Sequence, residues 1–99
     1  MTEQSQPKPI EIKIKVPDSL MGGVYANNVI ITHTKEEFIM TFTMITPPQG
    51  IVTSRVIMNP SHIKRFAMAL QDNIRKYEMI IAKIEPSGEP KGKFGFHPN

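Results

Sequence analysis

The chain has 99 residues, a formal net charge of +3 at pH 7 and no cysteine. This length allows one small domain, and the absence of cysteine excludes a disulfide framework, a thiol nucleophile and a thiolate metal site. No stretch is long and apolar enough to span a membrane, and the start MTEQSQPKPIE lacks the basic and apolar parts of a secretory signal, so we expect a cytoplasmic protein without membrane contact.

Both ends of the chain differ in composition from its middle. Residues 1–9 are mostly polar and include two prolines, and residues 85–99 are rich in proline, glycine and charge. Such composition predicts two flexible tails around a single folded domain at residues 10–84. Phe94 and Phe96, two aromatic residues in the second tail, are candidates for docking on a surface or a partner.

The folded part begins with a predicted strand at residues 10–16. Its sequence IEIKIKV alternates aliphatic and charged residues, a pattern typical of a strand with one buried and one wet face. Pro17 ends this strand. A loop is predicted at residues 17–26, where Gly22 and Gly23 permit a bend.

Three further strands are predicted at residues 27–34, 37–45 and 51–58. A turn with Thr34 opposite Glu37 joins the first two and gives three cross-strand pairs, His33 with Phe38, Ile31 with Met40, and Val29 with Phe42. Residues 46–50 (TPPQG) break the chain before the last strand. Its predicted partners are Ile51 for Ile45, Ser54 for Phe42, and Val56 for Met40.

A long amphipathic helix is predicted at residues 60–82. Asn59 is a favoured N-cap, Pro60 suits the first helical position, and apolar residues recur at helical spacing. We therefore predict an α+β fold in which a four-stranded antiparallel sheet, with strands two to four as a meander, precedes one long C-terminal helix packed on one sheet face. The apolar stripe of this helix consists of Ile63, Phe66, Ala67, Leu70, Ile74, Tyr77 and Ile81.

The parity of the strand residues predicts two different sheet faces. The helix is expected to cover the first, here called the Met/Phe face: Val29, Ile31, Phe38, Met40, Phe42, Met44, Val52, Val56 and Met58. The second, here called the Ile/Thr face, carries isoleucines among threonines and Arg55. Because one helix covers one face only, these isoleucines predict the interface of a homodimer or higher oligomer: Ile30, Ile39, Ile45, Ile51 and Ile57.

Catalytic, cofactor and metal sites are not predicted. His33, His62 and His97 lie in a hairpin, a helix start and a tail, with no cysteine or second histidine at a ligand spacing. The helix start at residues 59–61, followed by Lys64 and Arg65, offers only the weak anion affinity common to capped helices. The protein is accordingly interpreted as a non-enzyme.

Two kinds of partner remain open. In the first hypothesis, Met21, Met68 and Met79 give adaptable apolar contacts to a peptide, and the protein is an oligomeric protein-interaction module, with chaperone-like binding as one form of it. In the alternative, single-stranded nucleic acid binds the helical segment 60–84, which holds five basic residues against two acidic ones. The predicted phosphate contacts are Arg55, Lys64, Arg65, Arg75 and Lys76, with Tyr25, Phe94 and Phe96 available to stack on bases.

The runs YANNVIITHTKEEFIMTF at residues 25–42 and SRVIMNPSHIKRFAMALQDNIRKYE at residues 54–78 resemble a bacterial family known only as domain of unknown function number 3467. The resemblance implies a small bacterial or archaeal protein and supplies no activity. The order of antiparallel strands followed by a long helix is also similar to the secretion chaperone SecB and to the nucleic-acid-binding Whirly and PUR folds. Likeness of topology alone does not establish either function.

Overall fold

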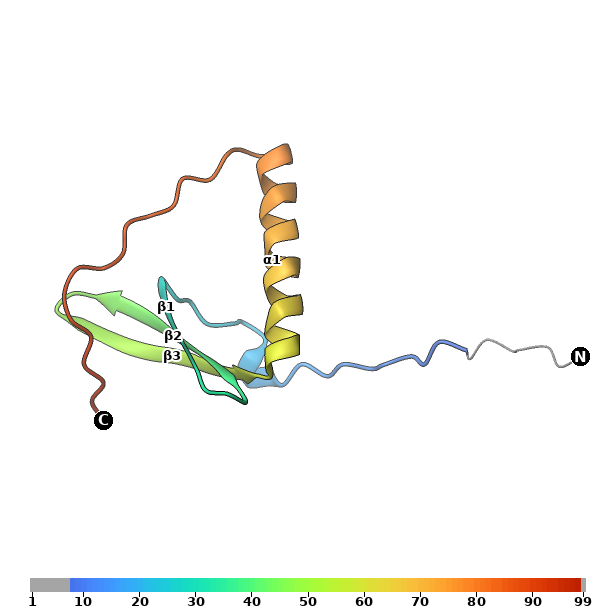
Figure 1. The fold of residues 1–99 in the computed structure, drawn as a ribbon, viewed down its shortest axis with the longest axis horizontal. Coiled ribbons are helices and arrows are strands. Elements are labelled where there is room, and N and C mark those ends of the chain that lie inside the picture. The colour runs from blue at the N-terminus through green and yellow to red at the C-terminus, as the bar shows by residue number, and fades with distance from the viewer. Residues whose placement is uncertain (1–7, 99) are drawn as a thin grey trace, which may run out of the picture.

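The computed structural model describes residues 8–98 and contains an antiparallel sheet followed by a long helix (Figure 1). The elements are η1 (Asp18–Leu20), β1 (Asn28–His33), β2 (Phe38–Thr46), β3 (Gln49–Met58) and α1 (Pro60–Ile80). The strands pair in the order β1-β2-β3. This confirms the α+β class, the antiparallel meander and the single long helix. Of the tail predicted at residues 1–9, residues 1–7 lie outside the described part of the chain.

The first hairpin has the predicted register. His33 pairs with Phe38, Ile31 with Met40, and Val29 with Phe42. In the turn, the Thr34 amide donates to the Glu37 carbonyl at 2.8 Å, while the Thr34 hydroxyl accepts from the amides of Glu36 and Glu37. The threonine side chain therefore stabilises a turn that lacks the Asn-Gly pair favoured in two-residue hairpin loops.

Asn27 extends this hairpin beyond the end of β1. Its side-chain amide donates to the Ile45 carbonyl at 2.9 Å and its side-chain oxygen accepts from the Ile45 amide at 2.8 Å. The neighbouring Asn28 bonds through its side chain to the Thr43 hydroxyl. The two asparagines of YANNV thus fasten the start of β1 to β2, a role that the sequence analysis did not assign to them.

The second hairpin contains a β-bulge that changes its register. Met40 pairs with Val56 and Phe42 with Ser54, as predicted, but Thr43 then pairs with Val52, which leaves Thr53 as an extra residue in β3. The predicted pair of Ile45 and Ile51 is wrong, because Ile45 lies opposite Gly50. Since directly paired residues share a face, Ile51 belongs to the Met/Phe face and Val52 to the Ile/Thr face.

The sheet has three strands and not the predicted four. Residues 8–17 have no regular secondary structure, and Figure 1 shows this segment leaving the base of α1 and running away from the sheet. The alternating pattern of residues 10–16 is a local property of the sequence. Whether such a segment becomes a strand depends on a neighbouring strand, and within the described chain none lies beside it.

The junction between β3 and α1 is formed as predicted. The Asn59 side-chain oxygen accepts from the His62 amide at 2.7 Å and from the Ser61 hydroxyl at 3.0 Å, and Pro60 occupies the first turn. Asn59 is the only residue between the last residue of β3 and the first residue of α1. This connection is shorter than most loops between elements, which have about four to six residues.

The helix does not cover the Met/Phe face as predicted. Figure 1 shows α1 rising steeply from the end of β3, and among the described elements only adjacent strands make more than marginal contact. A one-residue connection leaves too little chain to turn the helix back over its own sheet. The apolar residues of α1 do recur at helical spacing, but the sheet covers little of the stripe that they form.

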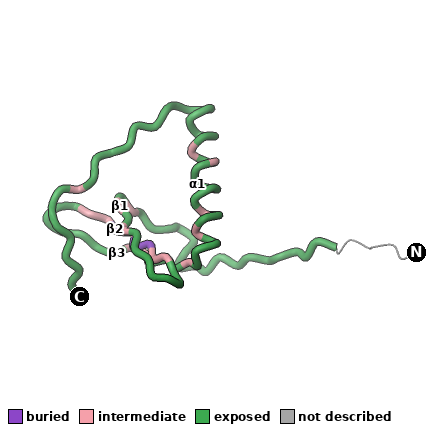
Figure 2. The backbone as a smooth tube through the Cα atoms, viewed as in Figure 1, coloured by how far each residue is buried: buried purple, intermediate pink, exposed green. Residues whose placement is uncertain are grey.

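Very little of the described chain is therefore buried (Figure 2). Met40 is the one apolar residue in the buried class, and Thr41 and Thr43 are the two buried polar residues. The radius of gyration of the Cα atoms is 19.0 Å, whereas a compact domain of this size has about 13 Å. The single domain predicted at residues 10–84 has no core of its own that matches its apolar content.

We predict that replacing Asn27 with Ala lowers the free energy of unfolding by about 1–2 kcal/mol, because two hydrogen bonds to the backbone of Ile45 are lost. The measurement is urea unfolding at a fixed protein concentration. Asn73→Ala is the matched control, since the Asn73 amide bonds only the Ala69 carbonyl on the exposed helix surface. Equal stability of the Asn27 variant and the wild type would contradict this role.

A second prediction concerns the helix cap. Asn59→Ala should destabilise the protein by about 1 kcal/mol, because the His62 amide loses its acceptor. Asn59→Asp keeps the acceptor and should retain most of the stability. The same unfolding experiment measures both, and a loss as large for Asp as for Ala would show that the cap is not the cause.

Candidate functional site

The helix stripe is the longest uncovered apolar surface of the chain. Ile63, Phe66 and Ile74 are half-buried, whereas Leu70 is 50% exposed and Tyr77 is 45% exposed. Ile81, just after α1, is also exposed. The sequence places these residues on one side of the helix, so the stripe is a continuous surface about 30 Å long for a helix of this length.

The Met/Phe face of the sheet is a second apolar surface, and it is covered only in part. Phe38, Phe42, Met44 and Met58 are half-buried around Met40. The outer residues on the same face are exposed: Val29, Ile31, Ile51 and Val56. Soluble monomers rarely expose contiguous apolar patches of this kind, which mark interaction surfaces.

The Ile/Thr face, which was predicted as the oligomer interface, is also covered only in part. Ile30, Ile39 and Ile45 are half-buried and only Ile57 is exposed. The C-terminal tail lies over part of this face, where Phe96 lines a shallow hollow with Thr41, Val52 and Arg55. Ile51 lies on the opposite face, so the register brings four of the five predicted interface residues together and separates the fifth.

The three methionines predicted as partner contacts are all exposed. Met68 and Met79 lie eleven residues apart on α1 and therefore on one side of it. Met21 lies just after η1, in a segment whose other apolar residues, Leu20, Val24 and Tyr25, are also exposed. The methionines thus occupy two separate surfaces.

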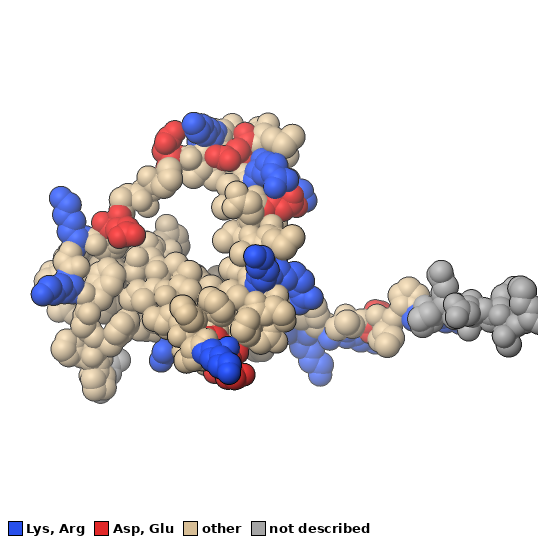
Figure 3. Space-filling view, in the orientation of Figure 1, with Lys and Arg blue, Asp and Glu red and all other residues tan. Residues whose placement is uncertain are grey.

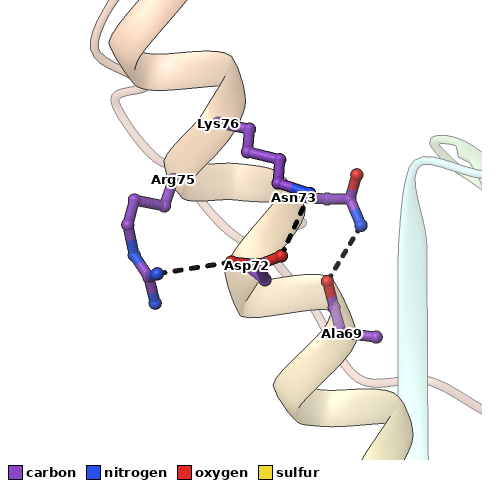
Figure 4. Close-up of polar contacts among 5 residues, drawn as sticks. All are labelled: Ala69, Asp72, Asn73, Arg75 and Lys76. Carbon is purple, nitrogen blue, oxygen red and sulfur yellow. Dashed lines mark hydrogen bonds and ion pairs between the residues drawn. The ribbon is translucent and has the colours of Figure 1, made fainter.

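Two of the basic residues of α1 pair with an acidic side chain. Arg75 and Lys76 both contact the Asp72 carboxylate at 3.3 Å (Figure 4). The Arg65 guanidinium lies 2.9 Å from His62 Nδ1, three residues earlier on the same helix. Arg55 lies on β3, apart from the helix, and the space-filling view shows acidic atoms interspersed with basic ones along α1 (Figure 3).

The histidines have separate local contacts. The His33 ring stacks on Phe38 with 5.3 Å between ring centroids, and His62 accepts from Arg65. His97 lies in the C-terminal tail near the turn of the second hairpin. Within residues 8–98, no group of three or more His, Asp or Glu side chains is placed to hold a metal ion.

The helix start has no anion-binding arrangement beyond its own cap. The Asn59 side-chain oxygen accepts from the His62 amide, and the Asn59 carbonyl accepts from the Ile63 amide at 3.0 Å.

Among the described helices, none has both the length and the hydropathy needed to cross a lipid bilayer.

Comparison with known proteins gives one match. The family model described as "Protein of unknown function (DUF3467)" matches residues 1–86, which include every helix and strand described above. No curated protein and no solved structure matches the chain significantly. By this match, which covers most of its length, the chain belongs to the DUF3467 family of proteins of unknown function.

Proposed function

We propose that the protein is a non-enzymatic, homo-oligomeric protein-interaction module whose fold is completed by a second copy. The observation that carries this proposal is the burial of a single apolar side chain, Met40, among the described residues. Folding must offset about 1–2 kcal/mol of backbone entropy per residue, mainly by removing apolar surface from water. One fully buried apolar residue, with the others only half-buried or exposed, falls short of that requirement, which supports further burial against another chain.

A second copy fits because one chain carries two apolar surfaces that do not meet. The helix stripe and the Met/Phe face are held apart by the one-residue junction at Asn59. In a two-fold dimer, the stripe of one copy packs on the Met/Phe face of the other, and the reverse contact follows by symmetry. Both copies then bury both surfaces without any change in the junction.

The proposed dimer leaves other apolar side chains exposed, and we propose these as the contacts for a partner protein. Met68 and Met79 lie off the helix stripe, and Met21 lies in the segment with Leu20, Val24 and Tyr25. Unbranched thioether side chains adapt to varied apolar surfaces at low cost. This supports binding of an apolar peptide segment of another protein, in the manner of a chaperone.

We predict that Leu70→Asp weakens self-association at least tenfold, because it places a charge in the centre of the helix stripe. Sedimentation or light scattering measures the mass, which for the wild type should be a multiple of 11.2 kDa. Gln71→Asp adds the same charge to an exposed neighbouring position and should leave the mass unchanged.

The wild type gives an independent check on the same proposal. The Tm of a homo-oligomer rises with protein concentration, whereas the Tm of a monomer does not. A cooperatively unfolding monomer with a concentration-independent Tm would overturn the proposed function.

Single-stranded nucleic acid is the competing partner, and we predict that it binds weakly. Asp72 offsets part of the charge of Arg75 and Lys76, which reduces the attraction for phosphate. Fluorescence anisotropy with a labelled oligonucleotide should show little affinity even at low salt. Strong binding that falls steeply with salt and disappears when Lys64, Arg65, Arg75 and Lys76 become Gln would instead favour the nucleic-acid function.

A further inference from the structure

Residues 10–16 have the sequence of a strand but no neighbouring strand. Ile10, Ile12 and Ile14 are 86%, 79% and 84% exposed, and Val16 is exposed as well. In this part of the described chain, no backbone amide donates to another backbone group before Leu20. Figure 2 shows the segment as a fully exposed trace that extends away from the sheet.

Such a segment is poorly suited to remain in water. Its four β-branched residues favour extended backbone, and the alternation places all four on one side. The other side carries Glu11, Lys13 and Lys15. A sheet edge would satisfy the backbone groups on one side of the segment and add its aliphatic side to an existing apolar face.

We propose that residues 10–16 of each copy pair with the free edge of β1 in a second copy, so that the fourth strand is supplied in trans. This inference rests on the homo-oligomer proposed above and adds the partner of one defined segment. The segment leaves from the base of α1 in a direction away from its own sheet (Figure 1), which favours the sheet of another copy.

The edge of β1 is favoured over the edge of β3. The extra residue Thr53 interrupts the regular ladder of β3, and bulges of this kind protect edges from pairing. Arg55 on the Ile/Thr face of β3 would also lie beside the lysines of the added strand, and like charges on adjacent strands repel. β1 has no bulge, no Lys, Arg, Asp or Glu, and six residues to match a segment of seven.

Pairing at β1 would enlarge the surface on which the partner helix packs. If the aliphatic side of residues 10–16 joins the Met/Phe face, it continues the exposed row formed by Val29 and Ile31. Lys13 and Lys15 then join the opposite face next to Thr32, where they remain in water. The added strand and the partner helix would therefore stabilise the same apolar layer.

Disulfide trapping between full-length chains tests this arrangement, since the sequence has no cysteine. A chain with Lys13→Cys is mixed with a second chain that carries Ile30→Cys or Thr32→Cys and a tag that changes its mass. Ile30 and Thr32 are chosen because they lie on the sheet face expected for Lys13. The register is not fixed in advance, so two β1 positions are used. Arg55→Cys on the same face of β3 is the matched control.

The proposal predicts that at least one β1 variant forms the mixed covalent dimer at least tenfold faster than the Arg55 variant. Preferential linkage to Arg55→Cys, or no linkage to either β1 position while light scattering shows an oligomer, would overturn the β1 pairing and leave the proposed function intact. A chain that carries both Lys13→Cys and Thr32→Cys provides a further test. A disulfide formed within this one chain would show that the strand pairs in cis and would overturn pairing in trans. A monomeric wild type would overturn both proposals.

Hydrogen exchange on the unmodified protein gives a second readout. Amides of residues 10–16 should exchange at least tenfold more slowly than expected for an unstructured peptide. Ile12→Pro, which removes one amide from the added strand, should abolish this protection, whereas Ser87→Pro in the C-terminal segment should not. Unprotected amides at residues 10–16 in the wild-type oligomer would overturn the proposal.

Discussion

A hydrophobic core requires two apolar surfaces that face each other. In this chain the two main apolar surfaces lie on a helix and a sheet that make little contact. The helix stripe and the Met/Phe face each have the composition of a core layer, yet a single residue joins the elements that carry them. Two features of the structure agree with this separation: the one buried apolar side chain and the large radius of gyration. This separation is the observation behind the proposed homo-oligomer, in which a second copy covers both surfaces.

The local structure could be predicted from the sequence because its causes are local. The register of the first hairpin follows from side-chain alternation and a four-residue turn, and the start of α1 follows from Asn59 and Pro60. The lack of a strand at residues 10–16 and the position of α1 beside the sheet could not be predicted, because each depends on which surface lies opposite. Periodicity identifies an apolar side of an element but not the chain that covers it.

The candidate site was predicted less well than the fold, again for physical reasons. A bulge at Thr53 shifts parity by one residue, so Ile51 and Val52 exchange faces without any signal in the alternation itself. Asp72 pairs with Arg75 and Lys76, two of the predicted phosphate contacts, since residues three and four apart meet on a helix. Asn27, directly before β1, is the sequence signal for the contact with Ile45, because asparagine side chains can bond backbone groups.

The direct passage from β3 into α1 also has a mechanical consequence. With only Asn59 between the two elements, and with its side chain bonded into the first helical turn, the helix has little freedom to swing independently of the strand. A force applied near Ile80 acts on the sheet through a rigid arm about 30 Å long. A partner that tilts the far end of α1 would therefore twist β3, and the hairpins attached to it, as one body.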